Sequence, residues 1–311
     1  MSVPQRDSRW RKSWRLIKIN KLACIGLVFF VLFVWVAIAG CVLTFGTKPV
    51  FDPSLVRLQE KLRPPLSKPS LETLLPEELP VLGIYLFGTD DLGRDVFARM
   101  LQGAWVSLTV GFVAVGISVL IGILMGGIAG YFGQDRPFID TLIMRFVDIM
   151  LCFPSFFLIL TVVALLPASM YNIMIVIGLT SWMGTTRFVR AEFLSLREQD
   201  FVTAARALGL NHARIIFRHM IPNAIAPVLV SATIGIATAI LTEAGLSFLG
   251  FGVPPPDATW GNILASGKDF IFDAPWLTFI PGFAILIVVL SFNLFGEGLR
   301  DVLNPKLRER Y

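Results

Sequence analysis

Six apolar runs divide the chain, and they constrain its fold more than any other feature. A helix that crosses a bilayer needs about 20 mostly apolar residues, and its backbone polar groups must be hydrogen-bonded internally. Pro154 interrupts the third run, and the fourth is short unless it extends to Arg190. The sequence therefore predicts an all-α polytopic membrane protein with six transmembrane helices, at residues 22–45, 105–130, 146–166, 173–188, 224–248 and 276–295.

The composition agrees with a membrane protein. Hydrophobic residues make up 55% of the chain, more than in an average soluble domain. The formal net charge is +5, but the basic residues flank the apolar runs and do not alternate with exposed aromatics. We therefore expect contact with membrane lipid and no binding of nucleic acid.

Lys and Arg beside the spans predict the orientation. Residues 1–21 carry seven basic side chains and one acid, which places the N-terminus in the cytoplasm. An even number of spans returns the C-terminus to the same side, so we expect a multi-pass protein of the cell membrane, plasma or inner. The predicted divisions are an N-terminal cytoplasmic segment with the first helix (1–45), an extracytoplasmic loop (46–103), a transmembrane core (104–300) and a cytoplasmic tail (301–311).

A basic, polar segment, 197–223, separates the fourth and fifth apolar runs. It is longer and more helix-forming than a simple turn requires. Ala204, Ala205 and Gly209 are predicted at neighbouring positions of a helix surface, where small residues allow another protein to approach closely. Pro222 is expected at the start of the next helix. The segment therefore predicts a cytoplasmic docking surface for a partner protein.

No set of catalytic residues emerges from the sequence, and we expect no resident metal. His212 and His219 lie two helical turns apart in the basic segment, where we favour surface hydrogen bonding or packing against a partner over a metal pair. No GxxxxGK[ST] phosphate loop occurs, so this chain is not expected to hydrolyse ATP in the way a P-loop protein does. The glycines of 122–130 lie within a span and favour close helix packing.

Charged residues near the membrane are candidates for function, because an ionisable group there needs a partner or water. Asp148 is one turn from Arg145, and a local ion pair is the favoured interpretation. Glu243 interrupts the fifth span, and it either borders a translocation pathway or makes a structural hydrogen bond. Asp90, Arg94 and Asp95 precede the second span and are predicted to form a rigid ionic corner at the outer mouth, which either fixes the loop or also serves a partner.

Several motifs together resemble one family. Thr203-Ala204-Ala205, Gly209 and Pro222 are similar to the EAA loop of importer-type ABC transporter permeases, with Thr203 in place of the usual Glu. The order of the remaining motifs is similar to that of C-type permease subunits of the peptide/nickel group, which includes the dipeptide and oligopeptide importers. These motifs are FGTD at 87–90 with GRD at 93–95; Asp140, Met144, Arg145, Asp148 and Pro154; LSFLG at 246–250; WGN at 260–262; PW at 275–276; and GLRD at 298–301 with Asn304-Pro305, where Asp-Pro is usual.

The resemblance implies the type I importer fold and a permease subunit that is not itself an enzyme. In that family the loop, here 191–222, is the socket for a cytoplasmic ATPase. The implied partners are a homologous second permease, two ATP-binding subunits that carry the ATP, and an extracytoplasmic substrate-binding protein. The residues implied for ATPase coupling are Thr203, Ala204, Ala205, Arg206, Gly209 and Pro222.

The substrate implied by the resemblance is a di- or oligopeptide, with nickel, glutathione or another small solute as the near alternative. A self-sufficient channel or ion-coupled transporter would belong to a different class. It should show paired intramembrane charges and inverted repeats, which are not visible in the sequence. An intramembrane enzyme would need a nucleophile–base or metal constellation inside the spans.

Overall fold

The computed structural model describes residues 21–46, 49–72 and 74–303. Regular structure in these ranges is helical, and strand-like pairing is limited to two isolated bridges, Ser67 with Tyr85 and Thr89 with Asp95. The predicted all-α architecture is confirmed. The basic N-terminal segment up to residue 20 and the tail from Asn304 onward lie outside the described residues.

Four helical stretches are long and apolar enough to cross a membrane, or five if a bent pair counts as one span. The first, third and fourth stretches correspond to the first, fifth and sixth predicted spans. The second begins earlier than predicted, at Val96. These four stretches are Lys21–Thr44 (α2), Val96–Phe132 (α3), His212–Phe248 and Trp276–Asp301 within α12 (Trp276–Leu303).

Each of the other two predicted spans is divided into two shorter helices. The third consists of α4 (Pro137–Leu151) and α5 (Ser155–Leu165), which are bent by 81° relative to each other. Pro154 lies at the break, because it lacks an N–H and disfavours helical conformation in the preceding residue. The fourth consists of α6 (Met170–Thr180) and α7 (Trp182–Arg197), with Ser181 between them.

The polar segment folds into short helices that lead directly into α10 (Ile221–Phe248). They are α8 (Asp200–Ala207), α9 (His212–Ile215) and the π-helical turn η3 (Ile216–Met220). The segments 49–95 and 249–275 contain three 3₁₀ turns, η1 (Leu58–Glu60), η2 (Pro76–Glu78) and η4 (Lys268–Phe270), and the short helix α11 (Trp260–Gly267).

Pro222 is the second residue of α10 and lies in the first turn of that helix, as the sequence predicts, although the chain before it is helical too. The residues before it, from His212 onward, are already helical, and Ile221 N–H donates to the carbonyl of Ile216. A proline inside an α-helix loses the bond to residue i−4 and collides with that carbonyl. The π turn immediately before Pro222 widens the helix at this point and accommodates the proline.

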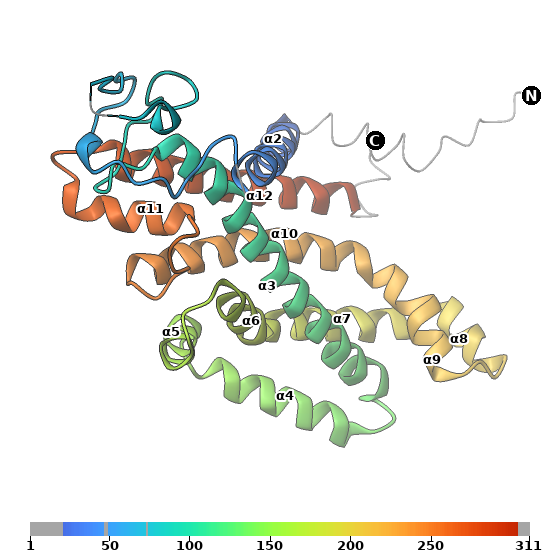
Figure 1. The fold of residues 1–311 in the computed structure, drawn as a ribbon. Coiled ribbons are helices and arrows are strands. Elements are labelled where there is room, and N and C mark those ends of the chain that lie inside the picture. Colours follow the sequence, from blue (N-terminus) through green and yellow to red (C-terminus); the bar gives the residue numbers. More distant parts are fainter. Residues whose placement is uncertain (1–20, 47–48, 73, 304–311) are drawn as a thin grey trace, which may run out of the picture.

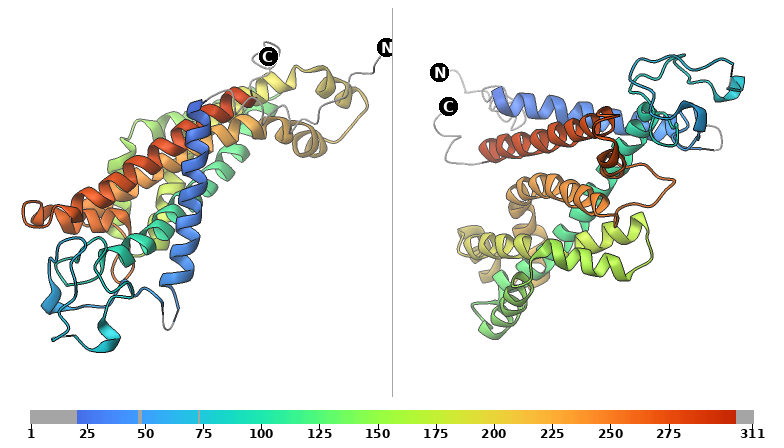
Figure 2. Two further views of the ribbon diagram at one scale, coloured as in Figure 1. Left: turned by 90° about the horizontal axis from the view of Figure 1, so that it is seen from above. Right: turned by 90° about the vertical axis from the view of Figure 1, so that its left-hand side faces the viewer.

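The spanning helices surround α3, which packs against α2, α6, α7 and α10, while α12 packs against α2 and α10. The segment 49–95 forms a cap at one end of this assembly, and α8 and α9 project from the opposite end (Figure 1). Figure 2 shows the same separation from two further directions. The long helices therefore connect two structurally different ends of the molecule.

The surface of α2 is strongly apolar. Leu32, Trp35 and Val42 are 51%, 66% and 72% exposed, respectively. Large apolar side chains exposed in succession along a helix are stable in hydrocarbon and unfavourable in water. This face of the molecule is suited to contact with lipid or with another membrane subunit.

Glycines bring α3 and α7 into close contact, as the glycine-rich sequence predicts. A Cβ atom at Gly126 would lie 2.5 Å from the carbonyl oxygen of Thr186, and one at Gly130 would lie 2.8 Å from that of Arg190. A Cβ atom at Gly122 would lie 2.5 Å from the side chain of Thr185. The four-residue spacing of these glycines gives α3 one side-chain-free face, which lies directly on α7.

Candidate functional site: the α8–α9 loop and the cavities between the helices

Residues 191–222 lie partly in α7 and partly in the projecting helices α8, α9 and η3. Helix α8 ends in a Schellman motif, in which Gly209 N–H donates to the carbonyl of Arg206 and Leu210 N–H to that of Ala205. Gly209 has φ +72°, a conformation that side chains with a Cβ rarely adopt. The turn between α8 and α9 therefore requires a glycine at this position, whether or not a partner protein binds there.

The predicted patch of small residues differs from the patch in the structure. Ala205 is only 4% exposed and packs into a core with Val202 and Ile215, so it does not face outward. Ala204 and Thr203 are exposed, and Gly209 lies beyond the end of α8 with open space around it. Successive residues of a helix point about 100° apart, so Ala204 and Ala205 cannot both belong to one face. Ala205 points into the core, and Ala204 points outward.

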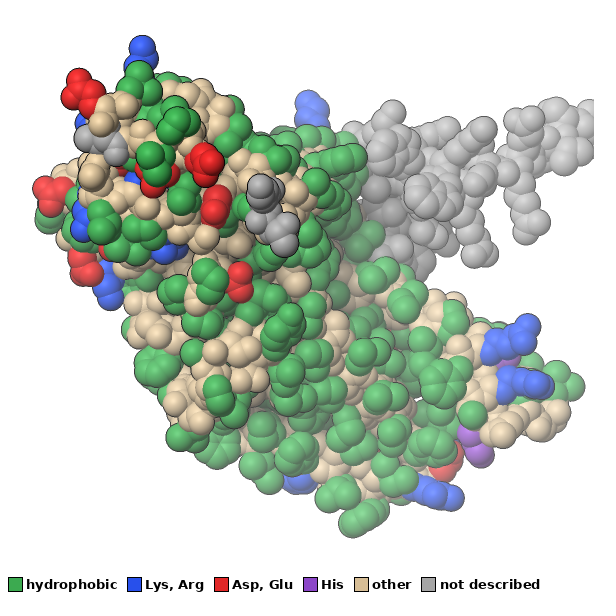
Figure 3. Space-filling model, in the orientation of Figure 1, with side chains coloured by type: hydrophobic (Ala, Val, Ile, Leu, Met, Phe, Trp, Pro, Cys, Tyr) green, Lys and Arg blue, Asp and Glu red, His purple; other side chains and the backbone are tan. Residues whose placement is uncertain are grey.

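The exposed side of this loop combines apolar side chains with arginines. Leu208 is 81% exposed and Phe217 is 64% exposed, and the arginines Arg214 and Arg218 are also exposed. Figure 3 shows basic and histidine side chains gathered at this end of the molecule. A projecting apolar surface bordered by positive charge is suited to binding a protein surface with complementary apolar and acidic groups.

Beneath this surface, a polar cluster attaches the loop to the C-terminal end of α3. Arg197 donates to the carbonyl oxygen of Tyr131 and to Asp135, both at 2.6 Å, and the Tyr131 hydroxyl lies 2.8 Å from His212 Nδ1. The guanidinium of Arg206 lies 5.0 Å from the centre of the Tyr131 ring. The hydrogen bond from Arg197 lowers the pKa of the Asp135 carboxyl.

The contact with Tyr131 gives His212 a structural partner. Within the described residues, no group of three or more His, Cys, Asp or Glu side chains is arranged to hold a metal ion. The hydrogen-bonding interpretation of His212 is therefore the one that the geometry favours. The sequence gives no sign of a special role for Tyr131, because the residue ends an apolar run and carries no charge.

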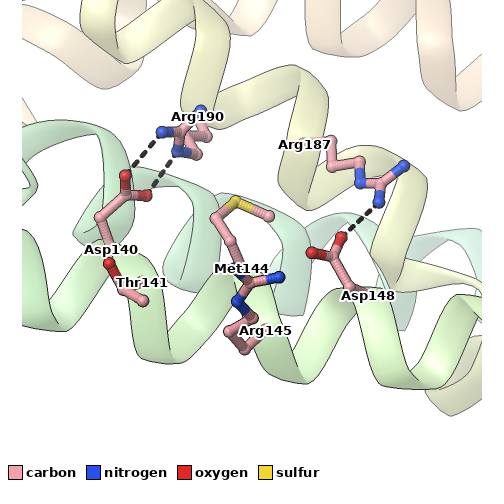
Figure 4. A pocket seen from close by; sticks show the side chains of 7 residues that line it. All are labelled: Asp140, Thr141, Met144, Arg145, Asp148, Arg187 and Arg190. Carbon is pink, nitrogen blue, oxygen red and sulfur yellow. Dashed lines mark hydrogen bonds and ion pairs between the residues drawn. The ribbon is translucent and has the colours of Figure 1, made fainter.

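Two ion pairs join α4 to α7 across a groove of about 510 Å³. Asp140 receives two hydrogen bonds from Arg190, and Asp148 pairs with Arg187 (Figure 4). The predicted local partner of Asp148, Arg145, is not the one it uses. The side chains of Arg187 and Asp148 are 53% and 45% exposed. Because exposed charges are costly in hydrocarbon, this face is suited to water or to another protein chain, and not to lipid.

A second cavity, of about 250 Å³, lies among α3, α6, α7 and α10. Its lining includes the hydroxyl side chains of Ser118, Ser181, Thr185, Ser231, Thr238 and Thr242. The members on α10 recur after seven and four residues, a spacing that places them on one helical face. This spacing is the signal from which the sequence could have identified the polar face of α10.

Glu243 does not reach that cavity. Its side chain is fully buried, and one carboxylate oxygen accepts a hydrogen bond of 2.7 Å from the Ser247 hydroxyl. Ser107 of α3 and Thr259 beside α11 lie next to the same carboxyl. In this conformation the residue sits among neighbouring helices, and a role in the translocation pathway stays a prediction.

The structure brings Asp90, Arg94 and Asp95 of the predicted corner together. Asp90 and Arg94 form an ion pair, whereas Asp95 caps a helix. Asp90 accepts side-chain hydrogen bonds from Arg94 and Arg99 and backbone bonds from residues 92 and 94. Asp95 takes no part in these ion pairs. It caps α3 by accepting from Phe97 N–H at 2.9 Å, and burial raises the pKa of its carboxyl.

Arg99 is the member of this corner that the sequence did not reveal. It is 4% exposed and also lies 3.4 Å from Asn262 of α11. The signal was an arginine immediately before an apolar run, since a buried arginine needs a carboxylate partner. The corner therefore joins the cap, α3 and α11.

Comparison with known families agrees with this architecture. Residues 118–309 match the family of binding-protein-dependent transport system inner membrane components, and residues 8–65 match the N-terminal transmembrane domain of oligopeptide transport permease C. The chain belongs to this family of transport permeases, so the predicted family resemblance is confirmed.

Similar proteins extend over most of the chain. The dipeptide transport system permease protein DppC of Alkalihalophilus pseudofirmus is 43% identical over 97% of this chain and 91% of its own length. The oligopeptide transport system permease protein OppC of Bacillus subtilis is 36% identical over the same two shares, 97% and 91%. The di/tripeptide permease DppC of Pseudomonas aeruginosa is 39% identical over 96% of this chain and 92% of its own length.

The fold itself is shared with a solved transporter. A chain of the inward-facing MetNI methionine ABC transporter superposes with a TM-score of 0.51 at 19% identity, covering 67% of this chain and 97% of its own. The predicted type I importer fold is thus confirmed for the helical core. At this level of identity the likeness concerns the fold alone.

Proposed function

We propose that this chain is one of two permease subunits of an ATP-driven importer that carries di- or oligopeptides into the cell. The single observation that carries the coupling part of this proposal is the projecting α8–α9 surface, anchored on α3 and exposing Leu208 and Phe217. Two partner subunits would bind ATP and dock on this surface, one on each permease. A substrate-binding protein would deliver peptide at the opposite end, beside the cap.

The peptide substrate is supported by the relatives named above, which are dipeptide, oligopeptide and di/tripeptide permeases. Uptake of labelled dialanine and trialanine by membranes containing the whole complex, with nickel and glutathione as competitors, tests this assignment. We expect excess unlabelled peptide to abolish uptake and the other two solutes to leave it unchanged. Competition by nickel or glutathione, and none by peptide, would assign the complex to the alternative substrates.

The docking surface predicts a loss of assembly when its apolar centre is charged. Leu208→Glu introduces a carboxylate at an 81% exposed position, so the subunit should fold but its contact with the ATP-binding subunit should be lost. The measurement is co-purification of the ATP-binding subunits, together with ATP-dependent uptake. Leu71→Glu is the matched control, because Leu71 is 75% exposed on the cap at the other end. Wild-type co-purification and uptake in the Leu208 variant would show that the loop is a simple connector.

We further propose that both chain termini and the α8–α9 loop are cytoplasmic and that the cap is extracytoplasmic. Flanking basic residues favour this orientation, and the cap and the loop lie at opposite ends of the spanning helices (Figure 2). In a cysteine-free background, an impermeant thiol reagent should label Leu71→Cys and Phe272→Cys in intact cells, because these positions are 75% and 96% exposed. Leu208→Cys should react only after the membrane is opened. Labelling of Leu208→Cys from outside would reverse the orientation.

A further inference from the structure

We propose that Tyr131 is the positioning residue through which movement of the α8–α9 loop is transmitted to α3. The inference rests on the proposed coupling function of that loop. It assigns the transmission to one side chain at the inner end of α3, which neither the sequence motifs nor the family match identifies. Three contacts, one from each of three different helices, converge on this residue.

Each part of Tyr131 holds a different element. Its backbone carbonyl accepts from Arg197, the last residue of α7, at 2.6 Å. Its hydroxyl lies 2.8 Å from Nδ1 of His212, the first residue of α9. Its ring lies 5.0 Å below the guanidinium of Arg206 in α8. The loop therefore cannot shift relative to α3 without breaking or moving contacts with this one residue.

The centre of this set of contacts is shielded from water. Tyr131 is fully buried and Arg197 is 5% exposed. Two buried guanidinium nitrogens of Arg206, Nε and Nη2, have no hydrogen-bond partner within the described residues, so the aromatic face is the main fixed contact of this cation. A cation over an aromatic ring gains most when both groups are shielded from water. The position of α8 is therefore tied to the ring of Tyr131.

Helix α3 is suited to carry the displacement through the membrane. It extends from the cap to the loop and packs against α2, α6, α7 and α10. The loop is also joined to α10, but the π turn η3 interrupts the regular α-helical ladder in that connection. An interrupted ladder is a place where a helix bends more readily. The contact through Tyr131 therefore gives the loop a second connection to the spanning helices, besides the one through η3.

The test uses the complete importer in liposomes, with the partner permease, the ATP-binding subunits and the binding protein. Three quantities are measured: uptake of labelled dialanine, ATP hydrolysis and the amount of assembled complex. Tyr131→Leu removes the ring and the hydroxyl, and Arg206→Met removes the cation while leaving the buried tyrosine in place. Gln134→Ala is the control, since Gln134 lies at the same junction and its side chain bonds Glu198, at the end of α7.

We expect Tyr131→Leu and Arg206→Met to lower uptake per ATP hydrolysed by about fivefold or more, the scale of a typical coupling free energy between two sites. Tyr131→Phe keeps the ring and should lose less, and Gln134→Ala should match the wild type. Unchanged uptake per ATP in both Tyr131→Leu and Arg206→Met would overturn the inference. Uptake and hydrolysis that fall together, in proportion to assembled complex, would also overturn it by assigning Tyr131 a purely structural role. Absence of ATP-dependent uptake by the wild-type complex would instead refute the proposed function.

Discussion

Replacing Asp90 by Asn is expected to lower the free energy of unfolding by about 3–5 kcal/mol, the usual cost of breaking a buried ion pair from one side. Asp90 is 1% exposed and Arg99 is 4% exposed, and they are joined by a direct ion pair. The amide keeps the size and part of the hydrogen bonding of the carboxylate. It leaves the charge of Arg99 buried and without its carboxylate.

The measurement is thermal unfolding of the purified subunit or complex in detergent. Asp91→Asn is the control, because Asp91 lies in the same turn and no ion pair of Asp91 occurs among those found in the described residues. The double variant Asp90→Asn with Arg99→Met removes both charges and should recover much of the lost stability, since no buried charge then stays unpaired. Equal melting temperatures for the Asp90 and Asp91 variants would show that the corner does not stabilise the fold.

The corner also joins the cap to the spanning helices, so its loss should change how firmly the cap is held. Arg99 lies in α3 and approaches Asn262 of α11, while Asp90 belongs to the cap. A weakened corner should therefore loosen the outer end of α3 from both neighbours. A cap that detaches before the helices melt would appear as an early step in proteolysis of the 49–95 segment.

The long spans could be predicted from the sequence because the requirement for about 20 apolar residues is local. The helices α2 and α12 could be predicted from their own apolar residues, without knowing which helices pack against them. The 81° bend between α4 and α5 is different. Pro154 indicates that a break occurs, but its angle depends on which helices the two pieces pack against. Ser181, where the fourth run divides, carries no comparable signal.

The sequence indicates which charged residues need partners, but it does not identify those partners. The sequence marks Asp148 as a charge in need of a partner and suggests Arg145, because helical spacing reveals only near neighbours. The actual partner, Arg187, lies on another helix and requires the three-dimensional fold. Tyr131 is a more severe case, since its importance depends on three helices that meet only after folding.

Adding a single methyl group at Gly126 is expected to lower the free energy of unfolding by about 1–3 kcal/mol, the usual cost of overpacking. The new Cβ of Gly126→Ala would lie 2.5 Å from the carbonyl oxygen of Thr186 and 2.9 Å from Val189 Cβ. The carbonyl belongs to the backbone of α7 and cannot rotate away as a side chain can. The methyl group must therefore push α3 and α7 apart.

Gly116→Ala is the matched control, because it lies in the same helix and a Cβ there meets no atom within 4 Å. It should leave the melting temperature unchanged or raise it slightly, since alanine favours helix over glycine. The two variants differ only in where the methyl group is placed. An equal effect of both would attribute any loss to glycine flexibility and not to the contact with α7.

The Gly126 variant also tests whether helix packing and coupling are linked. Separation of α3 from α7 moves Tyr131, which is on α3, away from Arg197, which is on α7. The contact that holds the inner end of the loop should therefore weaken together with the glycine contact. In reconstituted importer, Gly126→Ala should lower uptake per ATP as well as stability, and Gly116→Ala should lower neither. Reduced stability with normal uptake per ATP would mean that the junction at Tyr131 adjusts independently of the α3–α7 packing.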